Sequence, residues 1–316
     1  MNNKKYRTRR ITIGLLFLAL ACSPLLTAQG RFQVELYGGI SFLKLGDLNL
    51  LSKAEEQYNF TFFIQRLLGY EGYFTNDFPR ISDVVPAGFR AKYRLSETFA
   101  LSLDLEGFRR TREVSFSGTF SYSPSWTEVE TREYDPFRLT LRGISVMGGL
   151  HYLFRAGRPT EIEVGAAAGW TRAEFNFRSA WTMTIDLISG GFYHSSLDGG
   201  ALEGDGTGRG PAAKAMVRLN QALGRRFGFF VETAAMYCRL KSIRGGGRET
   251  RLGIPGETTW EGTWGIKKEE IEMSWGSAAV SVPTNYWGGW TEAQRERDFI
   301  LDLSGLRLVV GIFFRL

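Results

Sequence analysis

The chain ends on the stretch LVVGIFFRL, Leu308 to Leu316, in which every second residue is large and apolar. Successive side chains of an extended strand point to opposite sides, so these apolar residues would share one face. They are Leu308, Val310, Ile312, Phe314 and Leu316. A free C-terminus is usually frayed and polar. This one is instead predicted to be a strand that is built into a sheet.

The same alternation recurs along the chain and predicts eight strands. They cover residues 32–42, 85–95, 99–105, 144–154, 162–170, 213–219, 227–237 and 306–316. Outside the N-terminal segment, no apolar run approaches the ~18–20 residues of a membrane helix. The sequence therefore predicts an all-β fold.

The N-terminal segment predicts export. Five basic residues precede the apolar run ITIGLLFLALA, residues 11–21, which has the length of a signal-peptide core and is too short to span a bilayer. We expect residues 1–28 to be removed by cleavage after Ala28, with lipidation at Cys22 as the alternative. Residues 29–316 would then form a single barrel domain.

The charge balance changes once this leader is set aside. The full chain has 39 Lys and Arg against 33 Asp and Glu, but the leader holds five of the bases and no acid. The remaining chain is nearly neutral, so no nucleic-acid partner is implied. Cys238 is the only cysteine outside the leader, which argues against a disulfide framework or a Cys-rich metal site. We expect no cofactor.

The connections between the predicted strands indicate which face points outward. Short connections at residues 96–98, 155–159 and 220–226 alternate with long ones at residues 43–82, 118–136, 179–210 and 243–298. Outer-membrane barrels show this asymmetry, with periplasmic turns and external loops. Aromatic residues flank the short turns on the apolar face, as an interfacial girdle requires. They are Tyr93, Phe99, Tyr152, Phe154, Phe227 and Phe229.

The polar faces of the eight strands carry charges whose sign alternates from strand to strand. In order they are Glu35, then Arg90 and Lys92, Asp104 and Glu106, Arg138 and Arg142, Glu161 and Glu163, Lys214 and Arg218, Glu232, and Arg307. Charges in a narrow, poorly solvated interior need partners of opposite sign. The predicted lumen network comprises Glu35, Arg90, Lys92, Asp104, Glu106, His151, Glu163, Lys214, Arg218, Glu232 and Arg307. We expect these ion pairs to close the lumen.

The short turns predict the register of two pairs. A three-residue turn at 96–98 places Arg90 opposite Asp104. A five-residue turn at 155–159 places His151 opposite Glu163. We interpret His151 as a lumen histidine satisfied by this contact, in preference to a metal ligand or a catalytic base.

With its leader, eight alternating segments and closing strand GLRLVVGIFFRL, the chain resembles the small outer-membrane β-barrels of bacteria, similar in plan to the OmpX/Ail and OmpW-like proteins. The resemblance implies a closed, antiparallel, eight-stranded transmembrane barrel with long extracellular loops and projecting hairpins. It also implies contact with outer-membrane lipid and lipopolysaccharide, a monomeric state, and recognition of the last strand by the barrel-assembly machinery. That strand usually ends on an aromatic residue in this group, whereas this one ends on Leu316.

Two glycine pairs predict an irregularity in the strands. Gly143 and Gly149 share a layout with Gly305 and Gly311, and the apolar parity switches directly after the first glycine of each pair. A glycine β-bulge would re-aim the strand there.

Several predicted strands continue beyond the ~9–11 residues that a bilayer needs. The third runs on to Tyr122 and the turn at 123–125, and the fifth runs on to Leu187, which predicts a sheet projecting from the barrel. The last loop holds five tryptophans that form either a binding surface or a lid over the barrel mouth. They are Trp260, Trp264, Trp275, Trp287 and Trp290. A ten-stranded barrel using residues 257–282 is the weaker alternative.

These features predict a closed barrel that acts through its extracellular parts in surface contact, adhesion or envelope integrity, with an extracellular ligand among its expected partners. Uptake of small hydrophobic solutes, as in an OmpW-like barrel, is the alternative function. We expect no enzyme activity. The surface candidates His194, Ser195, Ser196 and Asp198 are too near in sequence to converge on one substrate.

Overall fold

The structure is a computed structural model, and it describes most of the chain after the leader. The described residues are 31–50, 71–75, 81–122, 127–155, 157, 159–189, 192–273, 276–283 and 296–316. The predicted signal peptide, 1–28, lies outside these residues, together with Ala28 and Cys22. Within the described part, no helix is both long and apolar enough to cross a membrane.

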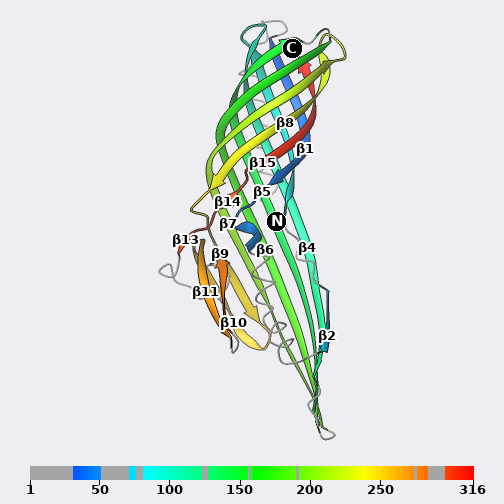
Figure 1. The fold of residues 1–316 in the computed structure, drawn as a ribbon, viewed down its shortest axis with the longest axis vertical. Coiled ribbons are helices and arrows are strands. Elements are labelled where there is room, and N and C mark those ends of the chain that lie inside the picture. The colour runs from blue at the N-terminus through cyan, green and yellow to red at the C-terminus, as the bar shows by residue number, and fades with distance from the viewer. Residues whose placement is uncertain are drawn as a thin grey trace, which may run out of the picture.

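Eight antiparallel strands close into a ring. They are β1 (Phe32–Leu43), β3 (Asp83–Arg94), β4 (Phe99–Tyr122), β5 (Thr127–Arg155), β6 (Thr160–Ser189), β7 (Phe192–Ala222), β8 (Phe227–Leu240) and β15 (Gly305–Arg315). Each strand pairs with the next, and β15 pairs with both β8 and β1, which closes the barrel (Figure 1). The C-terminal strand is therefore part of the barrel wall, and the predicted fold class is confirmed.

The outer face of the ring is apolar. Its exposed residues alternate along every strand with buried ones, and the C-terminal set illustrates the pattern. These residues are Leu306, Leu308, Val310, Ile312, Phe314 and Leu316. Aromatic rings meet beside the short turns, with Phe99 and Tyr152 at 5.1 Å and Phe227 and Phe314 at 5.3 Å between ring centroids. A ring that turns apolar side chains outward and charges inward is a transmembrane barrel of the bacterial outer membrane.

Four strands extend far beyond the barrel. β7 has 31 residues and β6 has 30, whereas β15 has 11 and β1 has 12. At about 3.3 Å per residue, the extra length carries these strands tens of ångströms away from the membrane. Figure 1 shows β4 to β7 leaving the barrel as long strands. The predicted projecting hairpins are confirmed, and the described residues of the expected long loops at 118–136 and 179–210 are paired strands.

Short strands widen this projecting sheet. β2 (Glu71–Thr75) pairs with β4, β9 (Arg244–Arg251) pairs with β7, and β10 (Ile254–Thr263) pairs with β9. β11 (Gly265–Met273), β12 (Gly276–Pro283) and β13 (Arg297–Asp298) form a separate sheet, and β14 (Leu301–Asp302) pairs with β8. The described residues of 257–282 therefore lie outside the ring, which has eight strands and not ten.

The predicted glycine bulge is wrong. β5 keeps one unbroken register against β4, from Phe99↔Tyr152 to Tyr122↔Val129, and Gly143 lies within it. Leu141 points inward just as Ser145 does, while Ile144 points outward into lipid. The apolar residues change from odd to even positions because the surroundings of both faces change at the level of Gly143. From Gly143 toward the projecting sheet, the outer face meets water and the interior is apolar. From Gly143 toward the short turns, the outer face meets lipid and the interior is polar.

The same change of surroundings corrects the prediction that Arg138 and Arg142 face the lumen. Their side chains lie on the outside of the extended wall, 58% and 60% exposed. The chain follows the same rule at Gly305, since Leu301↔Leu240 before it and Leu306↔Ala235 after it belong to one continuous register with β8.

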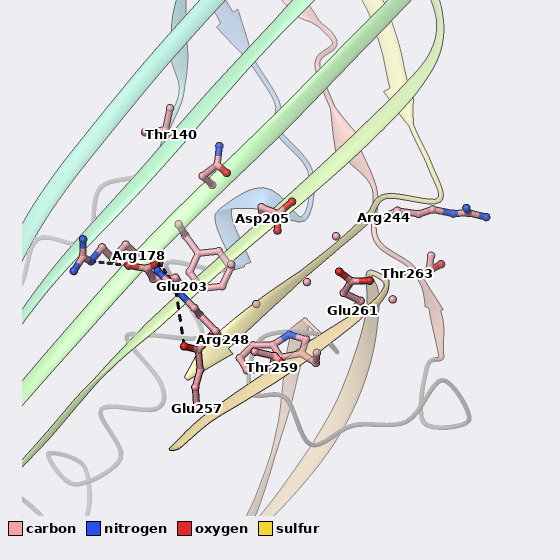
Figure 2. Close-up of a pocket in the computed structure, with 18 of the residues that line it drawn as sticks. Thr140, Arg178, Glu203, Asp205, Arg244, Arg248, Glu257, Thr259, Glu261 and Thr263 are labelled. Carbon is pink, nitrogen blue, oxygen red and sulfur yellow. Dashed lines mark hydrogen bonds and ion pairs between the residues drawn. The ribbon is translucent and has the colours of Figure 1, made fainter. Parts of the chain in front are cut away.

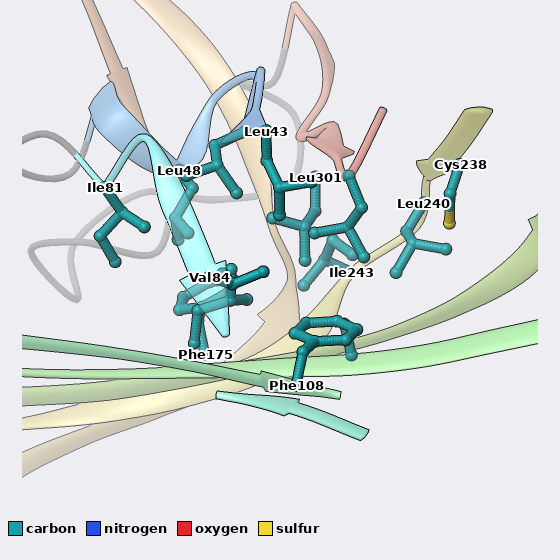
Figure 3. Packing of buried hydrophobic residues seen from close by; sticks show 14 of the residues in the cluster. Leu43, Leu48, Ile81, Val84, Phe108, Phe175, Cys238, Leu240, Ile243 and Leu301 are labelled. Atoms are coloured by element: carbon teal, nitrogen blue, oxygen red, sulfur yellow. The ribbon is translucent and has the colours of Figure 1, made fainter. Parts of the chain in front are cut away.

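An apolar core fills the interior above the lumen (Figure 3). Trp264 lies at its centre, fully buried, with ring centroids 5.4 Å from Phe175 and 5.9 Å from Phe299. Its indole Nε1 donates to the carbonyl oxygen of Asp205 at 2.9 Å, so the one polar atom of the ring is satisfied. Residues of β1, β3, β8 and β14 contribute to this core, which ties the projecting sheet to the barrel mouth.

Candidate functional site

The structure places the eleven residues of the predicted lumen network inside the barrel. Each has an exposed fraction of 3% or less. Five are carboxylates and five are Lys or Arg, with His151 beside them. The charges of the lumen therefore cancel without an external counterion.

Arg90 is the centre of the upper part of the network. Its Nε lies 2.7 Å from Oδ1 of Asp104, directly opposite on β4 as the turn register predicts. Its Nη1 lies 2.7 Å from Glu232 and 3.3 Å from Glu35. Lys214 reaches the other oxygen of Asp104 at 2.7 Å. One guanidinium thus links three strands across the lumen.

The remaining pairs extend the network along the lumen. Arg218 holds Glu35 at 2.7 Å, and its guanidinium lies 3.3 Å from the centroid of the Phe230 ring. Arg307 holds Glu106 with two hydrogen bonds, one of them 2.7 Å long, which fastens β15 to β4. These contacts span the barrel, so side chains cross the lumen from wall to wall, as the narrow interior of an eight-stranded barrel allows.

His151 is reached by a register that differs from the predicted one. The turn places Arg155 opposite Glu161, so His151 lies opposite Gly165 and not Glu163. The predicted register was wrong by two residues. The first strand continues one residue further than predicted, to Arg155, and its partner is Glu161 instead of Thr160. The side chain still reaches Glu163 diagonally, with Nδ1 2.7 Å from Oε1.

The other ring nitrogen of His151, Nε2, lies 2.8 Å from Oγ of Ser102. Two glycines make room for this arrangement, since a Cβ on Gly165 would lie 2.6 Å from Nδ1 and one on Gly149 would lie 2.7 Å from the Ser102 Oγ. Serine, histidine and glutamate stand in the order of a nucleophile triad. His151 and Glu163 are sealed in the ion network, however, so we interpret the trio as structural.

Neutral polar residues that the sequence reasoning missed complete the lumen. Asn220 donates to Glu163 at 3.0 Å, Gln33 donates to Glu35 at 2.7 Å, and the hydroxyls of Ser145 and Thr171 lie 2.8 Å apart. All of them occupy inward positions of the alternation. Their positions in the alternation could therefore have predicted that they face the lumen, whereas the predicted network comprised only charged residues and His151.

The tryptophans of the last loop divide into two groups. Trp264 is a buried lid residue, and Trp260 packs against the same apolar core. Trp275, Trp287 and Trp290 lie outside the described residues. The burial of Trp264 agrees with the interpretation as a lid, whereas Trp260 is partly buried and also lines the groove described next.

A polar groove of about 1270 Å³ lies over β5, β6, β7, β9 and β10 (Figure 2). Glu203 holds two arginines in it, with Arg178 at 3.1 Å and Arg248 at 2.6 Å. The hydrogen bonds and charge of Glu203 raise the pKa of Arg248 above its usual range. Glu203, Arg178 and Arg248 thus neutralise one another in part within the groove.

The far end of the projecting sheet has the opposite character. We call its exposed apolar residues beside the β6–β7 turn the apolar tip. They are Ile188, Phe192, Tyr193 and Leu197. Phe192 is 82% exposed. His194, Ser195, Ser196 and Asp198 lie on the same stretch of β7 and are exposed.

Comparisons with known proteins complete the description. No family model matches the chain, and no curated protein matches its sequence. Among solved structures, it is similar to Ail, the attachment invasion locus protein of Yersinia pestis (8% identity, 91% of this chain and 99% of that one, TM-score 0.29), and to the outer membrane protein OprG from Pseudomonas aeruginosa (9%, 91% and 97%, 0.31). It is also similar to CarO2 of Acinetobacter baumannii (10%, 78% and 96%, 0.28). The fold assignment rests on the strand pairing described above.

Proposed function

We propose that this protein is a closed barrel that anchors the projecting sheet in the outer membrane, and that the sheet makes contact with a surface outside the cell. The apolar tip is the observation that carries this proposal. Large apolar side chains gather there with little cover, and contiguous exposed patches of this kind mark interaction sites.

The position of the apolar tip supports an external partner. The tip lies at the end of the longest strands, far from the lipid-facing band of the barrel (Figure 1). The membrane that holds the barrel cannot cover it. Contact with another cell or surface would bury Phe192 and Tyr193, which are otherwise left in water.

The lumen supports an anchoring role in preference to transport. Five matched acids and bases occupy the barrel, and the apolar core packs directly above them. A hydrophobic solute would have to displace both layers. This argues against the alternative function, uptake of small hydrophobic solutes.

The test compares bacteria that display the wild-type protein with bacteria that display Phe192→Ser, Tyr193→Ser and Leu197→Ser together. A matched control carries Thr182→Ser and Thr250→Ser, two exposed positions on the same sheet. Attachment to cell layers, to hydrophobic beads and to neighbouring bacteria is counted, with surface amounts equalised. We expect attachment to at least one of them to need the protein and to fall in the triple variant but not in the control. Equal attachment of the variant and the wild type would contradict the proposal.

A further inference from the structure

We propose that the polar groove of the projecting sheet binds a neutral oligosaccharide borne by a surface outside the cell. The groove lies over β5, β6, β7, β9 and β10, and its volume is about 1270 Å³ (Figure 2). Pockets for small ligands usually measure about 300–1,000 Å³, so this groove has room for an extended ligand. The inference rests on the proposed function only in placing the partner outside the cell, and it does not use the apolar tip.

Strand β9 gives the groove a floor without side chains. Three successive glycines, Gly245, Gly246 and Gly247, occupy this part of the strand. A Cβ on Gly245 would clash with the carbonyl oxygen of Asp205, and one on Gly246 would clash with that of Trp260. The backbones of β7 and β10 thus approach β9 more closely than a residue with a side chain allows. The groove therefore stays open between the side chains of β7 and β10.

The strand register places two carboxylates on either side of this floor. The β7–β9 register brings Asp205 level with Gly246, and Glu261 of β10 is directly opposite Gly246. In Figure 2, β9 passes between Asp205 and Glu261. Next to Asp205, Asn176 of β6 is directly opposite it and continues the row. All three polar side chains are exposed, so the row is open to a ligand.

These three side chains differ from the arginines that Glu203 holds, because they have no partner in the described part of the chain. Within the described ranges, neither the carboxylates of Asp205 and Glu261 nor the amide of Asn176 form an ion pair or a side-chain hydrogen bond. An ionised carboxylate accepts hydrogen bonds from hydroxyl groups, and an amide both donates and accepts them. Such a row suits a ligand rich in hydroxyl groups, which is the chemistry of a sugar.

The charge of the whole groove favours an uncharged ligand. Four arginines and four carboxylates line it, so their formal charges sum to zero. A sulfated or sialylated glycan would gain no net attraction from this lining. The same holds for the phosphorylated sugars of lipopolysaccharide, and we therefore assign the ligand to a surface outside the cell.

A metal ion fits this site less well than a sugar. Asp205 and Glu261 provide two carboxylates, whereas Ca²⁺ takes about six to eight oxygen ligands. Among the residues that the structure describes, no three His, Cys, Asp or Glu side chains are grouped so that they could hold a metal ion. The two carboxylates are therefore assigned to hydrogen bonds with sugar hydroxyls.

The experiment applies the purified, folded protein in detergent to an array of neutral, sialylated and sulfated oligosaccharides, together with the polysaccharide of the bacterium's own lipopolysaccharide. The affinity of each glycan that binds is then measured in solution by calorimetry. The test variant carries Asp205→Ala and Glu261→Ala, two exposed positions whose change should leave the fold intact. The matched control carries Glu97→Ala and Glu296→Ala, which removes two exposed acids outside the groove.

We expect the wild type to bind at least one neutral oligosaccharide, and the test variant to bind it at least about tenfold more weakly, because hydrogen bonds to both carboxylates are lost. The single change Asp205→Asn should give an intermediate loss, and it provides the test if the double variant folds poorly. The control should bind like the wild type. The apolar-tip variant with Phe192→Ser, Tyr193→Ser and Leu197→Ser should also bind like the wild type, which separates this inference from the proposed function.

Four results would overturn the inference. Binding of no neutral oligosaccharide would mean that the groove is not a sugar site. Equal affinity of the test variant and the wild type would place the sugar elsewhere on the molecule. Equal or tighter binding of sialylated or sulfated glycans would contradict the assignment of a neutral ligand. Binding restricted to the bacterium's own polysaccharide would show that the ligand does not come from another surface.

Discussion

Arg90 lies directly opposite Asp104 in the β3–β4 pair, and its Nε donates to the Asp104 carboxylate at 2.7 Å. Lys214 holds the other carboxylate oxygen, so Asp104 is the acid shared by two cations. The three residues come from three strands, β3, β4 and β7. The stability of the barrel and its closed lumen therefore depend on the same contacts.

Asp104→Ala should destabilise the barrel strongly, because it leaves Arg90 and Lys214 with one carboxylate too few. Breaking a buried pair costs about 3–5 kcal/mol, and we expect the low end of that range because the remaining carboxylates stay close. The free energy of unfolding is measured by a urea refolding titration in detergent. The control is Glu113→Ala, which removes an exposed partner of Arg138 and should cost less than about 1 kcal/mol.

The double variant Asp104→Leu with Arg90→Leu should recover part of this loss. It removes one charge of each sign and leaves Lys214 within 3.8 Å of Glu232. Because the desolvation cost disappears with the attraction, the two changes should not add. Simple additivity would mean that the two side chains do not interact, and the β3–β4 register would be wrong.

Gly165→Ala should destabilise the wall beside His151. The added Cβ would lie 2.6 Å from Nδ1 and 3.1 Å from the carbonyl oxygen of Leu150. Overpacking of this kind costs about 1–3 kcal/mol. Gly148→Ala is the matched control, because its Cβ meets nothing closer than 4.0 Å and faces lipid. The midpoints of thermal unfolding of the two variants are compared in the same detergent. Equal midpoints would mean that Gly165 is not needed to make room for the His151 side chain.

Trp264→Ala should loosen the apolar core without opening the lumen. Removal of a fully buried Trp costs about 3–5 kcal/mol. We expect faster proteolysis of the projecting sheet and unchanged heat resistance of the barrel on gels. Phe192→Ala, at an exposed position, should change neither property. A barrel that unfolded with the core would show that the two layers are a single cooperative unit.

The carboxyl group of Asp186 should titrate below its usual range, because the hydroxyls of Ser195 and Tyr193 donate to it. A lowered pKa in the folded state means that the contribution to stability is present above the unfolded pKa of about 3.9 and is lost as the pH falls through the folded pKa. Ser195→Ala with Tyr193→Phe should move the pKa back toward its usual value. Side-chain NMR titration measures it, and an unchanged pKa would contradict the contact.

The alternation of residues and of charge sign predicted the barrel and placed Arg90, Asp104 and their partners, because parity in a strand specifies which face a residue occupies. Parity does not reveal the level at which lipid ends. Arg142 and Ile144 both point outward from strand β5, yet Arg142 lies beyond the lipid-facing band and Ile144 lies within it. The inner face changes at the same level, from the apolar Leu141 to the polar Ser145. Sequence reasoning therefore placed Arg142 in the lumen and attributed the reversal at Gly143 to a bulge.

The partner of His151 depended on the position of a turn, and a turn that lies one residue later along the chain shifts every pair beyond it by two residues. The diagonal contact with Glu163 survived only because the imidazole is long enough to reach it. The cluster of outward-facing arginines on β4 to β7 was not predicted, since it becomes visible only once Arg109 is known to oppose Arg142 and Arg172 to oppose Arg209.

The central claim is that charged side chains close the lumen, and electrical recording in planar bilayers tests it most directly. The purified full-length barrel is inserted, its insertion is verified independently by protease protection, and the current is recorded over a range of voltages. We predict no steady channel, because eight strands leave room only for side chains and the five matched ion pairs occupy that room. Steady ionic currents of porin size from the folded wild-type protein would contradict the closed lumen.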